Sequence, residues 1–266
     1  MVTGGFLRSK EQKQGKQLEK IDGLQNGNRV IQDDGAFMFG IDAVLLAHFA
    51  CGGVRAGENV IDLGTGNGII PLLMEKSCGA AHFTGLEIQE KSAGLAVRSV
   101  KLNSLEQKIE IVNGDIKNVA SLFAKHSFNV AVSNPPYALV EQGKTNAAEE
   151  KTIARHELLC TLEDVVAAAD YLLHSHGRFF MIHRPERLSD IFASLARHKL
   201  EPKRLQLVEP FEGEAANLVL IESRKDARPG LKLEPTLVVR YKNGEHKGEY
   251  TKEINKIYDS LASSKA

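Results

Sequence analysis

Two short stretches of this sequence place residues that can do chemistry directly after strand-like apolar runs. The first is VIDLGTGNG, in which Gly64, Gly66 and Gly68 follow a short buried strand and precede an apolar helix. Glycines let a ligand approach the backbone, and the start of the helix offers unpaired N–H groups to it. The spacing is GxGxG rather than GxGxxG, which argues against an NAD-dependent oxidoreductase.

The second stretch is SNPPY, Ser133 to Tyr137, at the end of the apolar run FNVAV. Asn134 and Pro135 each precede a proline, which restricts their backbone, and neither proline has an N–H to compete for the space. The Asn134 side-chain oxygen and the Pro135 carbonyl are then two rigid acceptors that match the two donors of a planar NH2 group. Tyr137 adds a flat face on which a base can stack. Pro136 completes the motif. Such a motif predicts a reaction in which an amino or amide nitrogen attacks an electrophile directly, with catalysis by positioning and fixed dipoles.

Acidic residues mark the ends of three strand-like runs. Asp62 lies in NVIDL, Glu87 ends FTGLE, and Asp115 follows KIEIV. In an open parallel sheet, ligands bind at the carboxyl ends of the strands. These three acids are therefore expected to meet at one ligand site.

The glycine motif after an acidic strand end resembles motif I of the class I S-adenosylmethionine-dependent methyltransferases. SNPPY matches the (N/D)PP(Y/F) signature of amino-group methyltransferases, which act on adenine N6, cytosine N4 or the glutamine amide nitrogen. The resemblance implies S-adenosylmethionine as cofactor, with Asp62 at its amino group, Glu87 at its ribose hydroxyls and Asp115 at its adenine. Other residues expected in the cofactor site are Gly64, Gly66, Gly68, Ile88, Ile116 and Asn134, and the expected catalytic residues are Asn134, Pro135, Pro136 and Tyr137.

The flanking segments are similar to a narrower family. GAFMFGIDAVLLAHFA and ARHELLCTLEDVVAAADYLLHSHGRFFMIHRPERLSDI resemble the tRNA1(Val) adenine N6-methyltransferase family, and the likeness runs from about residue 24 to residue 260. That family modifies the adenine 3′ of the anticodon, where bases are already partly unpaired and cheaper to extrude. The resemblance implies tRNA as partner, and it places Gly40 and Asp42 on a helix that helps to close over the cofactor.

Three arginines are expected to contact the substrate. Arg184 and Arg187 follow a predicted strand end, where they would reach phosphate at the rim of the site. Arg155 lies in a long polar loop that is expected to border the substrate. His156 beside it is expected to be structural, because this chemistry needs no general base.

The rest of the chain supplies elements to position these residues. Strand-like runs alternate with helix-like runs, which predicts an α/β protein with a mostly parallel sheet and helices on both faces. The resemblance implies a Rossmann-like class I methyltransferase fold with seven strands and a final antiparallel strand. We expect a flexible arm over residues 1–29, the methyltransferase domain over 30–223 and a charged tail without assigned structure over 224–266.

Composition limits the partners, metal sites and cellular compartment that can be expected. The 266 residues carry 34 Lys and Arg against 34 Asp and Glu, so overall charge offers no argument for nucleic-acid binding. The three cysteines are scattered and form no CxxC pair, which argues against a zinc site or a disulfide framework. The N-terminal stretch has no apolar signal-peptide core, and no run approaches the length of a membrane span. A cytoplasmic protein without a metal is expected.

Three other functions remain open at this stage. A protein glutamine methyltransferase of release factors uses the same NPPY, although that family carries a helical N-terminal domain that this chain does not resemble. An rRNA adenine or guanine methyltransferase would use the same chemistry. A non-catalytic RNA-binding or cofactor-binding protein on this scaffold is a different class, and the complete set of acids and Asn134 argues against it.

Overall fold

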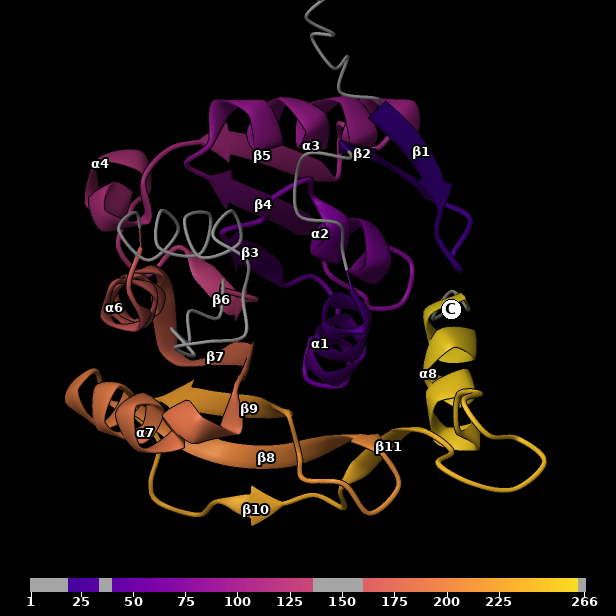
Figure 1. The fold of residues 1–266 in the computed structure, drawn as a ribbon. Helices are drawn as coiled ribbons and strands as arrows, with labels where there is room; N and C mark the ends of the chain where they lie inside the picture. The colour runs from indigo at the N-terminus through magenta and orange to yellow at the C-terminus, as the bar shows by residue number, and fades with distance from the viewer. Residues whose placement is uncertain (1–18, 34–39, 136–159, 263–266) are drawn as a thin grey trace, which may run out of the picture.

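The computed structural model describes residues 19–33, 40–135 and 160–262 (Figure 1). Its centre is a sheet whose strands come from the alternating part of the sequence. These strands are β3 (Asn59–Leu63), β4 (His82–Glu87), β5 (Ile109–Asn113), β6 (Phe128–Ser133), β7 (Leu173–His183), β8 (Leu200–Phe211) and β9 (Leu218–Lys225). Their order across the sheet is β5-β4-β3-β6-β7-β9-β8. The strands β3 to β7 are parallel, whereas β9 runs antiparallel to both of its neighbours.

The predicted fold class is confirmed by this arrangement. The strand order reverses at β3, because β4 and β5 lie on one side of it and β6 and β7 on the other. Ligands bind at such a reversal, where the crossovers diverge and leave a crevice. The closing strands β8 and β9 pair antiparallel, and two short strands, β10 (Lys232–Leu233) and β11 (Leu237–Arg240), extend the sheet by pairing with β8.

Helices cover both faces of the sheet. Successive side chains of a strand point to opposite faces, so each strand contributes to the helix layers on both sides. Phe180 and Ile182 of β7 join one core cluster, while Phe179 and Met181 join the other. The first cluster includes residues of α1 (Ile41–Cys51), α2 (Ile69–Met74), α3 (Glu90–Leu102) and α8 (Lys252–Ala262). The second includes residues of η1 (Ile116–Asn118), α4 (Val119–Leu122), α6 (Leu162–Leu172) and α7 (Leu188–Arg197), the last of which follows η2 (Pro185–Arg187).

Local signals in the sequence explain two helix starts. Thr161 accepts a hydrogen bond from the backbone N–H of Asp164 at 3.2 Å, and Asp164 Oδ2 accepts from the backbone N–H of Thr161 at 2.9 Å. This is a capping box, whose signature in the sequence is Thr161 followed three residues later by Asp164. Pro185 opens the turn that leads into α7, where its missing N–H costs nothing.

A hairpin of β1 (Glu19–Gly23) and β2 (Arg29–Asp33) precedes the main sheet. The Asn26 and Asn28 amides each donate to the Leu72 carbonyl, at 2.7 and 2.9 Å, which satisfies the end of the short helix α2. The predicted boundary at residue 29 falls inside this hairpin. Residues 1–18 of the predicted arm lie outside the described residues.

The C-terminal segment, to which the sequence assigned no structure, packs onto the core. Ile254 and Leu261 of α8 are fully buried. Ser77 Oγ donates to the Leu261 carbonyl at 2.8 Å, and the His48 ring lies 2.8 Å from Ser260 Oγ, which joins α8 to the turn after α2 and to α1. In Figure 1 the yellow helix α8 accordingly stands next to the α1 side of the sheet.

Candidate active site

The carboxyl ends of β3, β4, β5 and β6 lie at one edge of the sheet, because these strands are parallel. Backbone contacts join their ends. Gly64 and Thr65, after β3, both donate to the Leu86 carbonyl of β4, at 2.9 and 3.0 Å. Gly114, after β5, donates to the Glu87 carbonyl at 2.9 Å, and Ser133 Oγ of β6 donates to the Leu63 carbonyl at 2.8 Å. The structure therefore brings the predicted motifs together.

The glycine turn needs glycine at each of its three predicted positions. Gly64, Gly66 and Gly68 have φ of 79°, 59° and 83°, a region that other residues rarely adopt. A Cβ at Gly64 or Gly66 would meet no atom within 4 Å. The bare backbone therefore faces open space, which is the access that a bound ligand requires.

Asp62 is buried with no hydrogen bond to either carboxylate oxygen in the described part of the chain. The Thr65 hydroxyl and Asp42 Oδ1 are likewise buried without a partner. Burial raises the pKa of Asp62 to about 7; the nearby Thr65 hydroxyl opposes this rise, and the charge of Glu87 adds to it. Unpaired buried acceptors are costly, so the Asp62 carboxylate calls for a donor from outside the protein, and a cationic amino group suits it best.

Glu87 at the end of β4 is buried, and its carboxylate is held by backbone N–H groups. Oε2 accepts from Gly66 at 2.9 Å and Oε1 accepts from Gln89 at 2.8 Å. Each carboxylate oxygen keeps further capacity to accept. The Asn113 side chain donates to the Glu87 carbonyl at 2.8 Å and to the Ile88 carbonyl at 3.2 Å. The sequence analysis did not assign Asn113, although its place at a strand end was a signal.

Asp115 and Ile116 follow β5. Asp115 caps η1, because its Oδ1 accepts from the Lys117 backbone N–H at 2.9 Å, and Ile116 is buried behind it. Cys160, at the start of α6, packs against the same apolar cluster as Ile116. Burial raises the pKa of the Cys160 thiol to about 12, and the charges of Asp164 and Asp115 add to the effect. Cys160 is a second residue of this region that the sequence analysis did not assign.

Asn134 lies at the end of β6 and contacts α1. Its Nδ2 donates to Asp42 Oδ2 at 3.0 Å. Gly40, the N-cap of α1, allows this approach, since a Cβ there would lie 2.7 Å from Asp42 Oδ1. Pro135 is half-buried beside Asn134. The predicted site residues Pro136, Tyr137 and Arg155 lie outside the described residues.

Arg184 and Arg187 follow β7 at the same edge of the sheet. Arg184 Nη1 donates to the Asn217 carbonyl at 3.2 Å, and Arg187 Nε lies 2.7 Å from Asp190 Oδ2. His183, which ends β7, is buried. Burial and the charge of Arg187 lower the pKa of His183 to about 4, so its ring is neutral at neutral pH. Contact of the two arginines with a substrate phosphate stays a prediction.

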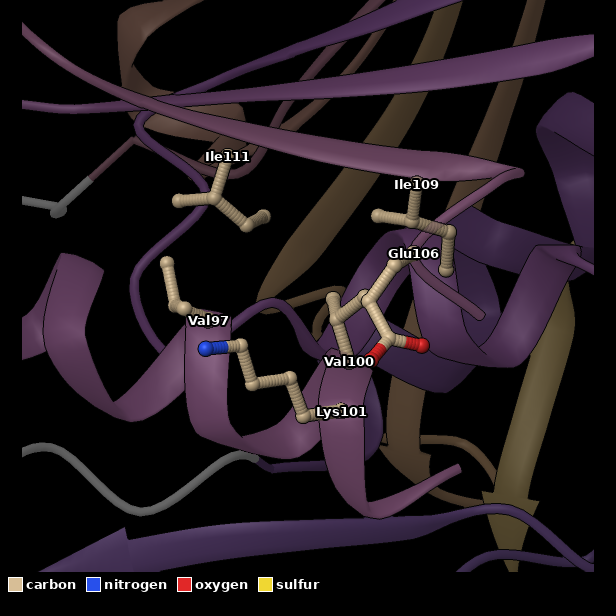
Figure 2. A pocket seen from close by; sticks show the side chains of 6 residues that line it. All are labelled: Val97, Val100, Lys101, Glu106, Ile109 and Ile111. Atoms are coloured by element: carbon tan, nitrogen blue, oxygen red, sulfur yellow. The ribbon is translucent and has the colours of Figure 1, made fainter. Parts of the chain in front are cut away.

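A separate pocket lies between α3 and β5 (Figure 2). Its walls are Val97, Val100, Lys101, Glu106, Ile109 and Ile111, none of which belongs to the predicted site. Val97 of α3 is exposed and lines this pocket. Within the described ranges, no three or more His, Cys, Asp or Glu residues are grouped to hold a metal ion, and no helix is long and apolar enough to cross a membrane.

Comparison with known proteins decides the family. The family model described as methyltransferase small domain matches residues 42–188. A protein from Porphyromonas gingivalis named tRNA1(Val) (adenine(37)-N6)-methyltransferase is 30% identical over 232 residues, which cover 84% of this chain and 89% of that protein. The chain belongs to the tRNA1(Val) adenine N6-methyltransferase family. It is thus a methyltransferase, and the resemblance stated from its motifs is confirmed.

Solved structures of other methyltransferases share the fold of this family member. A predicted O-methyltransferase from Agrobacterium tumefaciens superposes with a TM-score of 0.66 at 22% identity, over 84% of this chain and 97% of that chain. Geranyl diphosphate C-methyltransferase from Streptomyces coelicolor A3(2), solved with Mg²⁺, geranyl diphosphate and S-adenosyl-L-homocysteine, superposes with a TM-score of 0.51 at 13% identity, over 68% and 80%. Both likenesses concern the fold alone.

Proposed function

We propose that this methyltransferase transfers a methyl group from S-adenosylmethionine to N6 of an adenine in tRNA, the adenine 3′ of the anticodon. The observation that carries the proposal is the pairing of two features at one sheet edge. One is the set of buried, unpaired oxygens beside the glycine turn, and the other is Asn134 at the adjoining strand end. The name of the Porphyromonas gingivalis relative supports the choice of adenine and of tRNA.

The residues present fit the proposed cofactor. Its amino group is a cationic donor, and Asp62 offers two buried oxygens without a partner. Glu87 is fixed by two backbone N–H groups, so its remaining lone pairs can accept from ribose hydroxyls. Ile88 and Ile116 would flank the adenine, with Asp115 at its amino group. The open space at Gly64 and Gly66 leaves room for the cofactor to lie against the backbone.

The reaction would be a direct displacement: the bond between N6 and the methyl carbon would form as the methyl–sulfur bond breaks, S-adenosylhomocysteine would leave, and the methylated nitrogen would lose its extra proton to water. S-adenosylmethionine supplies an electrophilic methyl group on a sulfonium. The exocyclic nitrogen of adenine is a poor nucleophile, because its lone pair is delocalised into the ring. The Asn134 side-chain oxygen and the Pro135 carbonyl would accept its two N–H groups, which localises the lone pair and aims it at the methyl group. Fixed acceptors at rigid positions need no reorganisation during transfer.

Substrate binding would use the residues that surround this edge. Tyr137 would stack on the extruded adenine, and Arg155, Arg184 and Arg187 would contact the RNA backbone. The overall charge of the chain is balanced. Electrostatic attraction for RNA must therefore be local, at these arginines. We propose the cytoplasm as the place where enzyme and tRNA meet.

The deciding experiment is a transfer assay with radiolabelled S-adenosylmethionine and three substrates in parallel: unmodified total tRNA, rRNA and cell protein. Digestion of the labelled product identifies the methylated unit. N6-methyladenosine from tRNA is the expected result. Label in protein glutamine would overturn the substrate and move the same chemistry to release factors, and N6-methyladenosine from rRNA alone would make the chain an rRNA enzyme.

The variant Asn134→Ala tests the mechanism. It removes one of the two acceptors and leaves Asp62, Glu87 and the glycine turn intact. We expect transfer to fall by about 10²- to 10³-fold, the usual cost of losing one fixed dipole at a reacting centre. Binding of S-adenosylhomocysteine, measured by calorimetry, is expected to stay within a few fold of wild type. Unchanged transfer in this variant would exclude the mechanism.

A further inference from the structure

Asp42 and Asn134 are 92 positions apart in the sequence and meet at the active-site edge. Asp42 lies in the first turn of α1, and Asn134 follows β6. The 3.0 Å hydrogen bond between them runs from Asn134 Nδ2 to Asp42 Oδ2. Asp42 is buried and Asn134 is half-buried, so the contact is partly shielded from solvent. Hydrogen bonds of this kind, with an ionised acceptor, are among the stronger ones in proteins.

The two ends of an asparagine amide differ in chemistry but hardly in shape. One end donates and the other accepts, and rotation about the last side-chain bond exchanges them. The proposed reaction needs the accepting end toward the substrate amine. A carboxylate can only accept, so it holds the NH2 end of the amide and leaves the oxygen end on the other side.

We propose that Asp42 is a positioning residue that fixes the Asn134 amide with its Oδ1 turned toward the substrate amine. The inference deepens the proposed function and rests on it. The opposite orientation would set the Asn134 oxygen against a carboxylate oxygen, replacing a hydrogen bond with repulsion between two acceptors. Asp42 therefore acts on the orientation of the acceptor rather than on the substrate itself.

Both partners are held on elements that cannot easily shift. Helix α1 is anchored at its far end, where Arg178 Nη1 donates to the Gly53 carbonyl at 2.6 Å and Arg204 Nη2 to the Phe49 carbonyl at 3.2 Å. At the near end, the negative charge of Asp42 in the first turn suits the helix dipole. The end of β6 is tied to β3 through Ser133. The geometry of the contact is thus set by the fold.

The variant Asp42→Asn tests the proposal with almost no change of shape. The amide that replaces the carboxylate can both donate and accept, so it can meet Asn134 in either orientation and the selection is lost. We expect kcat, measured with saturating S-adenosylmethionine and tRNA, to fall by about 10- to 100-fold, as is common when an outer partner of a reactive group is removed. The same change of atoms at the exposed Asp226, which follows β9, is the matched control and should leave kcat within about twofold. If Asp42→Asn keeps a wild-type kcat at saturation and only binds cofactor more weakly, Asp42 is a cofactor ligand and the proposal is overturned.

A second measurement does not depend on the substrate. In ¹⁵N spectra, the Asn134 side-chain NH2 signals are identified by their loss in Asn134→Ala. A hydrogen bond to a carboxylate should shift one of these protons downfield, and Asp42→Asn should remove that shift. Identical Asn134 signals in wild type and Asp42→Asn would overturn the proposal even if transfer were impaired. Absence of any methyl transfer by the wild type would instead contradict the proposed function and leave this interpretation of the contact intact.

Discussion

At the scale of single residues, the buried Asp62 carboxylate is expected to favour cofactor binding but to lower the stability of the folded protein without cofactor. Its pKa of about 7 in the folded protein lies above the ordinary value of 3.8 because the carboxyl is buried. A cationic amino group binds the carboxylate form. We therefore expect affinity for S-adenosylhomocysteine to weaken as pH falls through about 7, when Asp62 takes up a proton. Calorimetric titrations from about pH 6 to about pH 8.5 should show this slope in the wild type, and Asp62→Asn should bind weakly with no such slope. An equal slope in the variant would assign the titration to another group.

The same pKa fixes the sign of a stability effect in the protein without cofactor. Between about pH 4 and pH 7 the unfolded chain releases the Asp62 proton while the folded chain keeps it, so the free energy of unfolding falls as pH rises. Above pH 7 the folded protein carries an unpaired buried charge. Asp62→Asn should therefore be more stable than wild type at about pH 8, by about 1–2 kcal/mol, and the difference should shrink as the pH is lowered. Denaturant unfolding at both ends of this range measures it, and a variant destabilised at the higher pH would contradict the expectation.

At the scale of elements, the glycine turn combines backbone strain with ligand access. Gly66 and Gly57 both have positive φ and open space where a Cβ would stand, but Gly57 lies in the turn before β3, outside the site. Alanine at either position should cost about 1–2 kcal/mol of stability, since both must hold a left-handed backbone. Gly66→Ala alone should also weaken cofactor binding, because its methyl group enters the proposed cofactor space. Comparison of unfolding free energies and of S-adenosylhomocysteine affinities for the two variants separates the effects. Equal affinity in both would place the cofactor elsewhere.

At the scale of the whole molecule, the C-terminal segment completes the core that carries α1. Ile254 of α8 is fully buried in the cluster that also contains Leu45 and Leu46 of α1. Ile254→Ala should lower the free energy of unfolding by about 2–5 kcal/mol, the range for a buried large-to-small change. The exposed Lys256 of the same helix is the matched control, and its change to Ala should have an effect within about 0.5 kcal/mol. A small loss at Ile254 in denaturant unfolding would mean that α8 does not support the core.

Features that depend on residues close in the sequence could be predicted from the sequence, whereas features that depend on distant residues could not. Alternating runs, the glycine turn, the capping box at Thr161 and the restricted SNPPY backbone depend on neighbours within a few residues, so the sequence by itself determined the α/β class and most candidate site residues. Parallel pairing then dictates that strand ends share an edge, which made the meeting of Asp62, Glu87 and Asn134 predictable.

Contacts between distant segments were decided by the tertiary structure alone. The docking of α8 on α1, the role of Asn113 in holding the β4 end and the pairing of Asp42 with Asn134 join residues that no local pattern relates. Asp42 shows the difference most clearly. The family resemblance alone implied a cofactor role for Asp42, whereas its partner depends on where α1 packs. The packing of a helix on a sheet depends on the whole core. The core therefore places Asp42 next to Asn134, and this contact is proposed to orient the Asn134 amide.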